Sequence, residues 1–564
     1  MSVPPARWPE AASTFARTYG LRGVALRVLH ESRRRAGAFR RIPRHGADLT
    51  TPAPHPYWVD PAALAAATDR TAALARADRV TSGEYEAYRW SWRTLPSLPD
   101  DWHRSPGARQ AFPSDLPWWS VPHAAIDAGD IKDVWEPGRF AWVYDLVRGW
   151  LLSGDTRYAE AFHRLFADWC RSSPPFLGAQ WACGQETAIR AVALLYAEAN
   201  LVQSPASTPE RMASVASILS ASGERIEDAI GYGISQRNNH AVSEAVGLIV
   251  LGERFRDRHP DAARWLRHGH RLLDRTVREQ FAADGWYIQH SFNYLRLALD
   301  QCVIGVRALR RSGSELSASS LDRLRAAVDL LCAVIEPASG IVPNHGHNDG
   351  SFVHPVTLAT YRDYRATLTT AASTLGAALP SDIAIDRESL AWVGSALPSR
   401  CAPTGDGVRT GSSGWAAARV GESFVFIRAG SYVSRPAHVD PLHIDIRMGG
   451  REVIADAGTY SYNAPPPWRN GLAAGHLHNG PVIDGEEPAA RGGRFLFVLW
   501  PTARIARAEM GNREAVIEAE QPGRVSRTVR VMPDEVVVTD ASIDPTARRI
   551  RVEWLLHPDA DARQ

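Results

Sequence analysis

The sequence predicts a chain of two parts, a helical part followed by an antiparallel β part. Its 564 residues exceed what one hydrophobic core usually supports. From about residue 135 to 379, apolar residues recur every three or four positions, as in FAWVYDLVRGWLL and LDRLRAAVDLLCAVI. After about residue 413 the period changes to two, as in SFVFIRAG and SRTVRVMP.

The helical part is expected to span residues 110–394. Gly and Pro separate its apolar runs, and consecutive amphipathic helices with short loops pack as antiparallel hairpins. A bundle or a ring of helices is therefore expected. Residues 1–109 are rich in Arg, Pro and Trp with weak periodicity, and we interpret them as an N-terminal extension. Its basic run at 33–41, RRRAGAFRR, is interpreted as a solvated helix face.

The β part is expected to follow a linker at residues 395–413, which is rich in Gly, Ser, Pro and Thr. Turn signals separate the strand patterns of residues 414–564, which favours an antiparallel sandwich or barrel. These patterns are WAAARV, SFVFIRAG, IDIRMG, EVIADAG, RFLFVLWP, SRTVRVMP, EVVVTDASI and RRIRVEWLL.

Composition excludes several functional classes. With 64 basic and 62 acidic residues the net charge is +2, which argues against a nucleic-acid binder. The single lysine, Lys132, lies in GDIKDVW, so there is no GxxxxGK[ST] phosphate loop. The five cysteines form no CxxC pair and are expected to be reduced and structural.

No apolar run approaches the roughly 18 residues of a membrane span. The N-terminus lacks an apolar signal region, which favours the cytoplasm; a misassigned start codon would instead allow a periplasmic or secreted protein.

Polar residues gather at 235–240, SQRNNH, just before the apolar run AVSEAVGLIVLG. Asn238 or Asn239 can cap the helix that follows. The segment holds more donors than a cap needs. Gln236, Arg237, Asn239 and His240 are therefore candidate ligands for an anion at the helix N-terminus.

Two further polar clusters precede the β part. In DGWYIQHSFNY (284–294), Tyr294 is a candidate phenol for a cleft and His290 a candidate substrate contact, whereas Tyr287 is expected to pack in a core. In PNHGHND (343–349), the HxH pattern suits either a metal site or a substrate-binding loop, which makes His345 a second candidate contact.

The β part carries a fourth cluster, in which histidines and an aspartate come from three segments: His438 to His443, Asp456, and His476 to His478. Imidazole nitrogen and carboxylate oxygen form a ligand set that zinc accepts. Spacing alone leaves a zinc site and ordinary satisfied histidines equally open.

The order of four motifs resembles the heparinase II/III-like polysaccharide lyases, a group with relatives that act on alginate. The motifs are RNNHAVSEAVGLIVLG, DGWYIQHSFNYLRLALD, RPAHVDPLHIDIRMGGREVIADAGTYSYN and HLHNG, and DIKDVWEPGRF and GQETAIRAVALL fit the same family. The resemblance covers roughly residues 110–500. It implies an N-terminal incomplete (α/α) toroid followed by an antiparallel β-sandwich.

The resemblance implies β-elimination at a uronic acid of an acidic polysaccharide or oligosaccharide. The C5 proton is weakly acidic, so the enzyme must neutralise the neighbouring carboxylate with preorganised donors. Asn239 and His240 match the family positions for this task, with Gln236 and Arg237 as supporting donors. Tyr294 would carry the proton, activated by nearby positive charge; for protons on opposite sugar faces, His240 becomes the base and Tyr294 the acid.

The resemblance also implies a structural zinc held by His438, Asp456 and His478, with His476 as a substitute for His478. Many members carry HxHxD, but here Pro436 replaces the first histidine. Either a subgroup lacks that histidine, or His443, His345 or His347 fills the space. The neighbouring Arg435 would suit an acidic sugar.

Two other functions stay open. A toroid-type glycosidase needs two carboxylates in its cleft, and Glu186, Glu136 and Asp284 are available. Glu186 and Arg190 lie four residues apart and are expected to pair along a helix. A non-catalytic polysaccharide-binding protein of an exopolysaccharide system is the third possibility. The polysaccharide, endo or exo action and the oligomeric state are not predicted.

Overall fold

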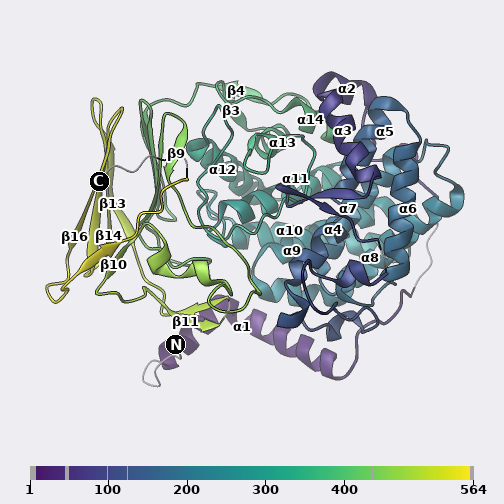
Figure 1. Ribbon diagram of the computed structural model, residues 1–564, viewed down its shortest axis with the longest axis horizontal. Helices are drawn as coiled ribbons and strands as arrows, with labels where there is room; N and C mark the ends of the chain where they lie inside the picture. The colour runs from purple at the N-terminus through teal and green to yellow at the C-terminus, as the bar shows by residue number, and fades with distance from the viewer. Residues whose placement is uncertain are drawn as a thin grey trace.

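The computed structural model describes residues 8–44, 50–97, 99–123, 125–434, 436–493, 495–558 and 560. Helices occupy one side of the molecule and strands the other (Figure 1). The helices are α1 (Trp8–Arg35), α2 (Pro61–Ala67), α3 (Arg70–Thr81), α4 (Ile131–Gly138), α5 (Trp142–Ser153), α6 (Arg157–Ser172), α7 (Gly184–Leu201), α8 (Pro209–Gln236), α9 (Asn239–Phe255), α10 (Ala262–Gln280), α11 (Phe292–Arg311), α12 (Ala318–Val334), α13 (Arg365–Leu375) and α14 (Arg387–Val393).

The helical part has inner and outer helices. Every residue of α7 is buried, and α9 and α11 are buried along most of their length. The outer helices α8, α10 and α12 pack against these inner ones; α10 and α12 bury one face, whereas α8 is also buried all round from Ile218 to Ile226. Polar residues therefore continue through α10 at helical spacing, whereas α9 is apolar almost all round, as its buried position requires.

The N-terminal region joins both parts. Helix α1 is interrupted at Gly20, where a φ of 66° suits a residue without a side chain. It packs on α8 and contacts β12 (Leu496–Val498), so it runs beneath helices and strands alike (Figure 1). Helix α3 packs on α5, and β1 (Glu84–Ala87) pairs with β2 (Ser91–Thr94). Much of the region expected to be an extension thus packs on the helical part.

The β part is a sandwich of two antiparallel sheets. One has the order β5-β6-β7-β8-β9 and the other β13-β14-β15-β16, and one apolar core cluster draws residues from both. The strands are β5 (Gly407–Gly411), β6 (Trp415–Val420), β7 (Ser423–Arg428), β8 (His443–Met448), β9 (Arg451–Ile454), β13 (Arg504–Met510), β14 (Ala515–Gln521), β15 (Val525–Val531) and β16 (Val536–Ser542). Shorter pairs are β3 (Ala378–Pro380) with β4 (Ser399–Cys401), β10 (Pro481–Ile483) with β17 (Ile550–Val552), and β11 (Ala490–Gly493) with β12.

Each of the eight expected strand patterns contains a strand, and the structure adds others. Strand β5 lies inside the segment expected to be a linker. Strands β13 and β14 were not predicted, although β14 buries every second residue. Their apolar residues are mainly alanine and isoleucine between charged residues, a weaker period-two pattern than that of β15.

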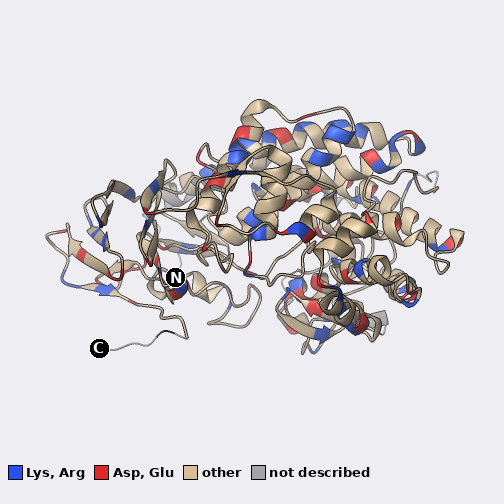
Figure 2. Cartoon of the chain, turned by 90° about the horizontal axis from the view of Figure 1, so that it is seen from above, with Lys and Arg blue, Asp and Glu red and all other residues tan. Residues whose placement is uncertain are grey.

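Acidic and basic residues alternate over the surface, and Figure 2 shows no face of a single charge in that view. Among the described residues, no helix combines the length and apolar character that a membrane span requires.

Candidate active site

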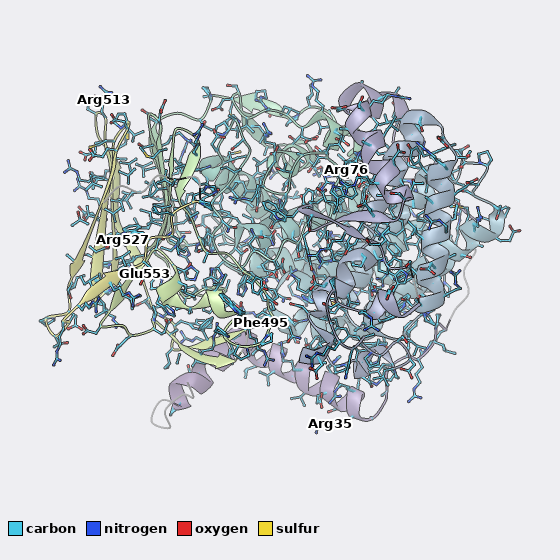
Figure 3. The ribbon with its side chains drawn as sticks, viewed as in Figure 1. Arg35, Arg76, Phe495, Arg513, Arg527 and Glu553 are labelled. Carbon is cyan, nitrogen blue, oxygen red and sulfur yellow. The ribbon has the colours of Figure 1, made fainter. Side chains whose placement is uncertain are left out.

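A cleft of about 460 Å³ lies where the helices meet the β part. Gln236, Asn239, His240 and Tyr294 line it, as the sequence predicted for one common site. Helix α1 closes one side through Tyr19. The β part supplies further lining residues, namely Pro436, Ala437, Tyr462, Phe495 and Leu496. Figure 3 shows Phe495 above α1 at the boundary between strands and helices.

Four helices begin at this cleft. Lining residues come from the first turns of α4, α7, α9 and α11, namely Lys132, Glu186, His240 and Tyr294. The backbone N–H groups at a helix N-terminus carry partial positive charge. The arrangement therefore favours an anionic ligand in the cleft.

The segment between α8 and α9 is held from several sides. Asn238 caps α9, its Oδ1 accepting from the N–H of His240 at 3.2 Å. Gln280 Nε2 donates to the Asn238 carbonyl at 2.9 Å, and Tyr287 Oη donates to Gln280 at 2.8 Å. Tyr287 thus lies in the core, as expected, and supports the segment from behind.

Tyr294 is part of a hydrogen-bonded group. Its hydroxyl donates to Asp349 Oδ2 at 2.6 Å and lies 3.1 Å from the hydroxyl of Tyr462. Asp349 forms an ion pair with Lys132, the only lysine of the chain. Asn293 Nδ2 also donates to Asp349, at 3.2 Å.

These contacts determine the resting protonation state. Burial raises the pKa of Tyr294 well above its usual value, and the Asp349 carboxylate adds to this. Burial also acts to raise the pKa of Asp349, but Lys132 holds it below its usual value. The Tyr294 hydroxyl thus contacts a carboxylate and not the cation expected from the sequence, and the phenol rests protonated.

The loop that carries Asp349 is fixed against the start of α11. A Cβ added at Gly346 would lie 2.1 Å from the His290 carbonyl oxygen, and its φ is 80°. Ser291 Oγ donates to the His347 carbonyl at 2.5 Å. Only glycine allows this approach, which places Asp349 beside Tyr294.

The candidate glycosidase carboxylates are all bound to other side chains or backbone groups, and of the three only Glu186 lines the cleft. Arg139 binds Glu186 through two hydrogen bonds of 2.6 and 2.9 Å and Glu136 through one of 3.0 Å. The predicted pair between Glu186 and Arg190 is wrong, because Arg190 donates to backbone carbonyls. Asp284 accepts from Ser413 on the β part.

The predicted metal residues come together behind the cleft wall. His438, Asp456 and His478 form a buried group, and Asp440 joins it, with one ligand atom of each within 4.8 Å of the others. Asp456 Oδ2 lies 3.0 Å from His478 Nδ1, and its Oδ1 lies 3.5 Å from His438 Nδ1. The ring of His347, which lines the cleft, packs on His438 with centroids 5.1 Å apart.

This group fits a divalent metal. Nε2 of His438 and of His478 and Oδ2 of Asp440 are buried without a hydrogen-bond partner among the described residues. Unsatisfied nitrogen and oxygen donors in one place are what zinc coordination would use. His476 is half-exposed and pairs with Glu487, so it does not replace His478 here.

Other predicted substrate contacts lie away from the cleft. His345 is buried in a second cluster with His443 and Asp456. Arg237 has a φ of 50°, and its guanidinium donates to the carbonyls of Arg17 and Thr18 on α1. Arg237 and His290 line a separate cavity behind the wall that holds Asn239. Arg435 lies outside the described residues.

Sequence reasoning missed Lys132, Asp349, Tyr462 and Asp440 as site residues. Two signals were present: Lys132 is the only lysine, and Asp440 follows His438 at the spacing of the HxD motif. Asp349 and Tyr462 reach the cleft through tertiary packing, which no local pattern reports. Pro436, which stands where the resemblance led us to expect a histidine, lines the cleft, and His347 lines it too.

Two family models match the chain. The heparinase II/III N-terminus model covers residues 106–372, and the heparinase II/III-like C-terminal model covers residues 402–564. No curated protein matched the sequence.

Solved structures resemble the chain over most of its length or over about half of it. The crystal structure of heparinase III is 16% identical in sequence, and the match covers 95% of this chain and 77% of the heparinase III chain with a TM-score of 0.58. Heparan sulfate lyase HepC from Pedobacter heparinus is 17% identical, with coverage of 92% and 74% and a TM-score of 0.46. Alginate lyase A1-III from Sphingomonas species A1 is 16% identical, with coverage of 49% and 82% and a TM-score of 0.28.

The first of these structures shows the shared fold, and the predicted toroid and β-sandwich are confirmed. The two family models cover most of the sequence and place the boundary between their domains where the helices give way to strands. The chain therefore belongs to the heparinase II/III-like family of polysaccharide lyases.

Proposed function

We propose that the chain cleaves a uronic-acid-containing polysaccharide or oligosaccharide by β-elimination in the cleft between helices and strands. The observation that carries this proposal is the Tyr294 hydroxyl, which donates to Asp349 in the same cleft that Asn239 and His240 line. Such a site suits elimination better than glycoside hydrolysis, which uses two carboxylates in the cleft.

Recognition of the substrate begins with its carboxylate. Asn239 offers its side-chain amide at the N-terminus of α9, because its backbone N–H is already bound to Gln289 Oε1 at 2.8 Å. The other helix N-termini at the cleft add partial positive charge. Neutralising the carboxylate and the developing enolate with fixed donors is worth several kcal/mol per good donor, about 3 to 4 kcal/mol.

We infer the two proton transfers from the contacts of Tyr294. Because Tyr294 is protonated, it is the acid that gives its proton to the leaving O4, and Asp349 keeps the hydroxyl oriented. The C5 proton then needs a second acceptor, and His240, which also lines the cleft, is that base. The C5–H electrons form the C4–C5 double bond as the bond from C4 to O4 breaks.

Zinc belongs to this proposal as a support. His438, Asp440, Asp456 and His478 would hold it, and when bound it would brace the β wall of the cleft. His347 packs on His438 and, with ring centroids 5.3 Å apart, on Tyr462. The brace would thus keep Tyr462 beside Tyr294.

Cleavage in ¹⁸O-labelled water tests the reaction class. Elimination adds no water, so neither product carries the label, and the new non-reducing end is unsaturated. Hydrolysis instead places ¹⁸O on the anomeric carbon of the fragment that gains the new reducing end, and the other fragment keeps its own unlabelled O4. Mass spectrometry of products from a uronic-acid polysaccharide separates the two, and incorporated label would contradict the proposal.

A further inference from the structure

A second cavity, of about 750 Å³, lies at the same junction of helices and β part. It shares no lining residue with the catalytic cleft. Residues 236–240 and 289–290 form the wall between them: Gln236 and Gln289 face the cleft, whereas Arg237 and His290 line the cavity. Its volume lies in the range of small-molecule sites.

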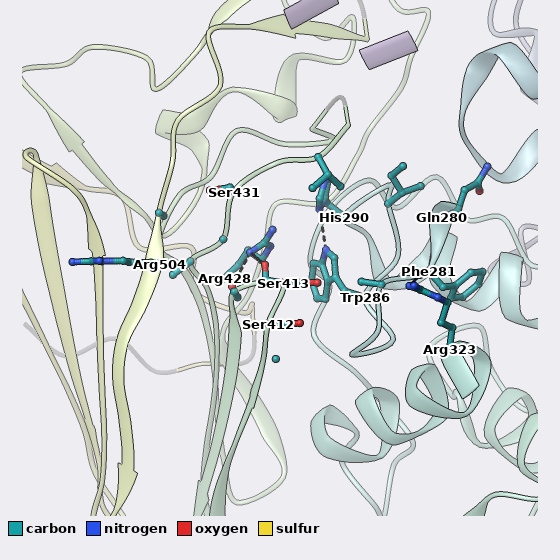
Figure 4. Close-up of a pocket in the computed structure, with 18 of the residues that line it drawn as sticks. Gln280, Phe281, Trp286, His290, Arg323, Ser412, Ser413, Arg428, Ser431 and Arg504 are labelled. Carbon is teal, nitrogen blue, oxygen red and sulfur yellow. Dashed lines mark hydrogen bonds between the residues drawn. The ribbon is translucent and has the colours of Figure 1, made fainter. Parts of the chain in front are cut away.

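The cavity lining is basic. Five arginines line it against one carboxylate, Glu279. Arg278 pairs with Asp274 and Arg504 with Glu520. Figure 4 shows the remaining side chains reaching it from both parts: Arg323 from the helices, Arg428 from the strands.

Three of the arginines form no ion pair with a described residue. These are Arg237, Arg323 and Arg428, and their hydrogen bonds go to backbone carbonyl oxygens. Burial lowers the pKa of Arg428, and the carboxylates of Asp440 and Asp284 oppose this shift from farther away. Guanidinium groups without an ion-pair partner around a cavity attract an anion and bind oxyanions well.

Arg428 supplies two unused donors. It is 2% exposed, and its Nη1 donates to the carbonyls of Ser413 and Gly414 at 2.8 and 2.7 Å. Its Nε and Nη2 are buried without a partner among the described residues. A buried charged donor left unsatisfied is costly, so a ligand that accepts from it would be favoured.

His290 supplies a third donor of the same kind. It is 3% exposed, and its Nδ1 accepts from Trp286 Nε1 at 2.9 Å (Figure 4). Burial lowers the pKa of His290 well below its usual value, so the ring is neutral and its proton is on Nε2. That Nε2 is buried and has no partner among the described residues.

All three unused atoms are donors, and none is an acceptor. We propose that this cavity binds an oxyanion, a carboxylate or a sulfate-like group, through Arg428, His290 and Arg323. The oxyanion is either free or carried by an acidic sugar. The site is separate from the catalytic cleft, and the inference does not depend on the reaction proposed above.

Diffraction from crystals soaked in selenate locates the site, because selenium gives an anomalous peak. A peak in this cavity beside Arg428 is the expected result. Selenate found only in the catalytic cleft, or not found in the protein, would overturn the proposal.

Calorimetric titration with sodium sulfate, sodium glucuronate and neutral glucose, at constant ionic strength, identifies the source of the oxyanion. Sulfate or glucuronate should bind and glucose should not; tighter binding of glucuronate means that a sugar carries the group, and tighter binding of sulfate means a free ion. Binding should persist in Asn239→Ala, which removes the proposed carboxylate donor of the catalytic cleft and no residue that lines this cavity.

Substitution tests the assigned residues. Arg428→Gln removes two donors but also disturbs two backbone contacts, so Arg323→Gln, which loses one backbone contact, is the safer variant. Either should weaken binding roughly tenfold or more. The control is Arg264→Gln, a half-exposed arginine of α10 paired with Glu227. Equal affinity in Arg323→Gln, Arg264→Gln and the wild type would refute the assignment.

Discussion

Replacing Glu244 by Gln should stabilise the protein at alkaline pH. Glu244 lies one turn beyond His240 on α9, is 3% exposed, and its Oε2 has no hydrogen-bond partner among the described residues. Its carboxyl group lies against Gly184 at the start of α7 and Gly233 on α8. Burial raises the pKa of this carboxyl to about 8, and Arg225 opposes the shift only in part.

The magnitude follows from proton linkage. Between pH 4.5 and about 8, the folded protein keeps a proton on Glu244 that the unfolded chain releases. Stability from this group is therefore full below pH 4.5 and is lost as the pH rises toward 8. At about 1.4 kcal/mol per pH unit, the loss is on the order of 5 kcal/mol. Gln has nearly the same shape and no such loss.

Urea unfolding at pH 5 and pH 8.5 measures the effect. Glu244→Gln should match the wild type within about 1 kcal/mol at pH 5 and exceed it by several kcal/mol at pH 8.5. Glu160→Gln, on the exposed face of α6, is the matched control and should change neither value. A stability difference for Glu244→Gln that is the same at both pH values would refute the reasoning.

Lys132→Met leaves the buried Asp349 carboxylate unpaired, so the free energy of unfolding at pH 7 should fall by about 3 kcal/mol, and by less at pH 4. Lys132→Arg should retain most of the wild-type stability. An equal loss of stability in both variants would contradict the ion-pair argument. Asn239→Ala should lower kcat about 10²- to 10³-fold in a steady-state assay of product formation, whereas a change confined to KM would deny it a role in the transition state. Bound zinc, measured by elemental mass spectrometry, should be lost in His478→Ala and kept in His476→Ala; the reverse would exchange the two ligands.

The sequence predicted the fold through its periodicity. The change of apolar period from about 3.6 to 2 marks the passage from helices to sandwich, because each period follows from the geometry of its backbone. Strand β5, within a segment rich in Gly and Ser, was missed because its stability comes from pairing with β6 and not from its own residues.

The site was predictable where its residues share a local motif. Gln236, Asn239 and His240 lie around the start of one helix, and Asn238 caps it. Arg237 stands between them in the sequence, yet its left-handed backbone turns it to the other side of the wall. Tyr294 meets Asp349 and Tyr462 only because three segments distant in sequence pack together, and this also reversed its expected electrostatic environment.

Ultraviolet absorbance during incubation with a panel of uronic-acid polysaccharides tests the central proposal most directly. A β-elimination product carries a C4–C5 double bond conjugated to the carboxylate and absorbs, whereas a hydrolysis product does not. The account predicts a rise for the wild type on at least one polysaccharide and none for Tyr294→Phe with an unchanged thermal midpoint. New reducing ends without a rise in absorbance, or full activity in Tyr294→Phe, would contradict it.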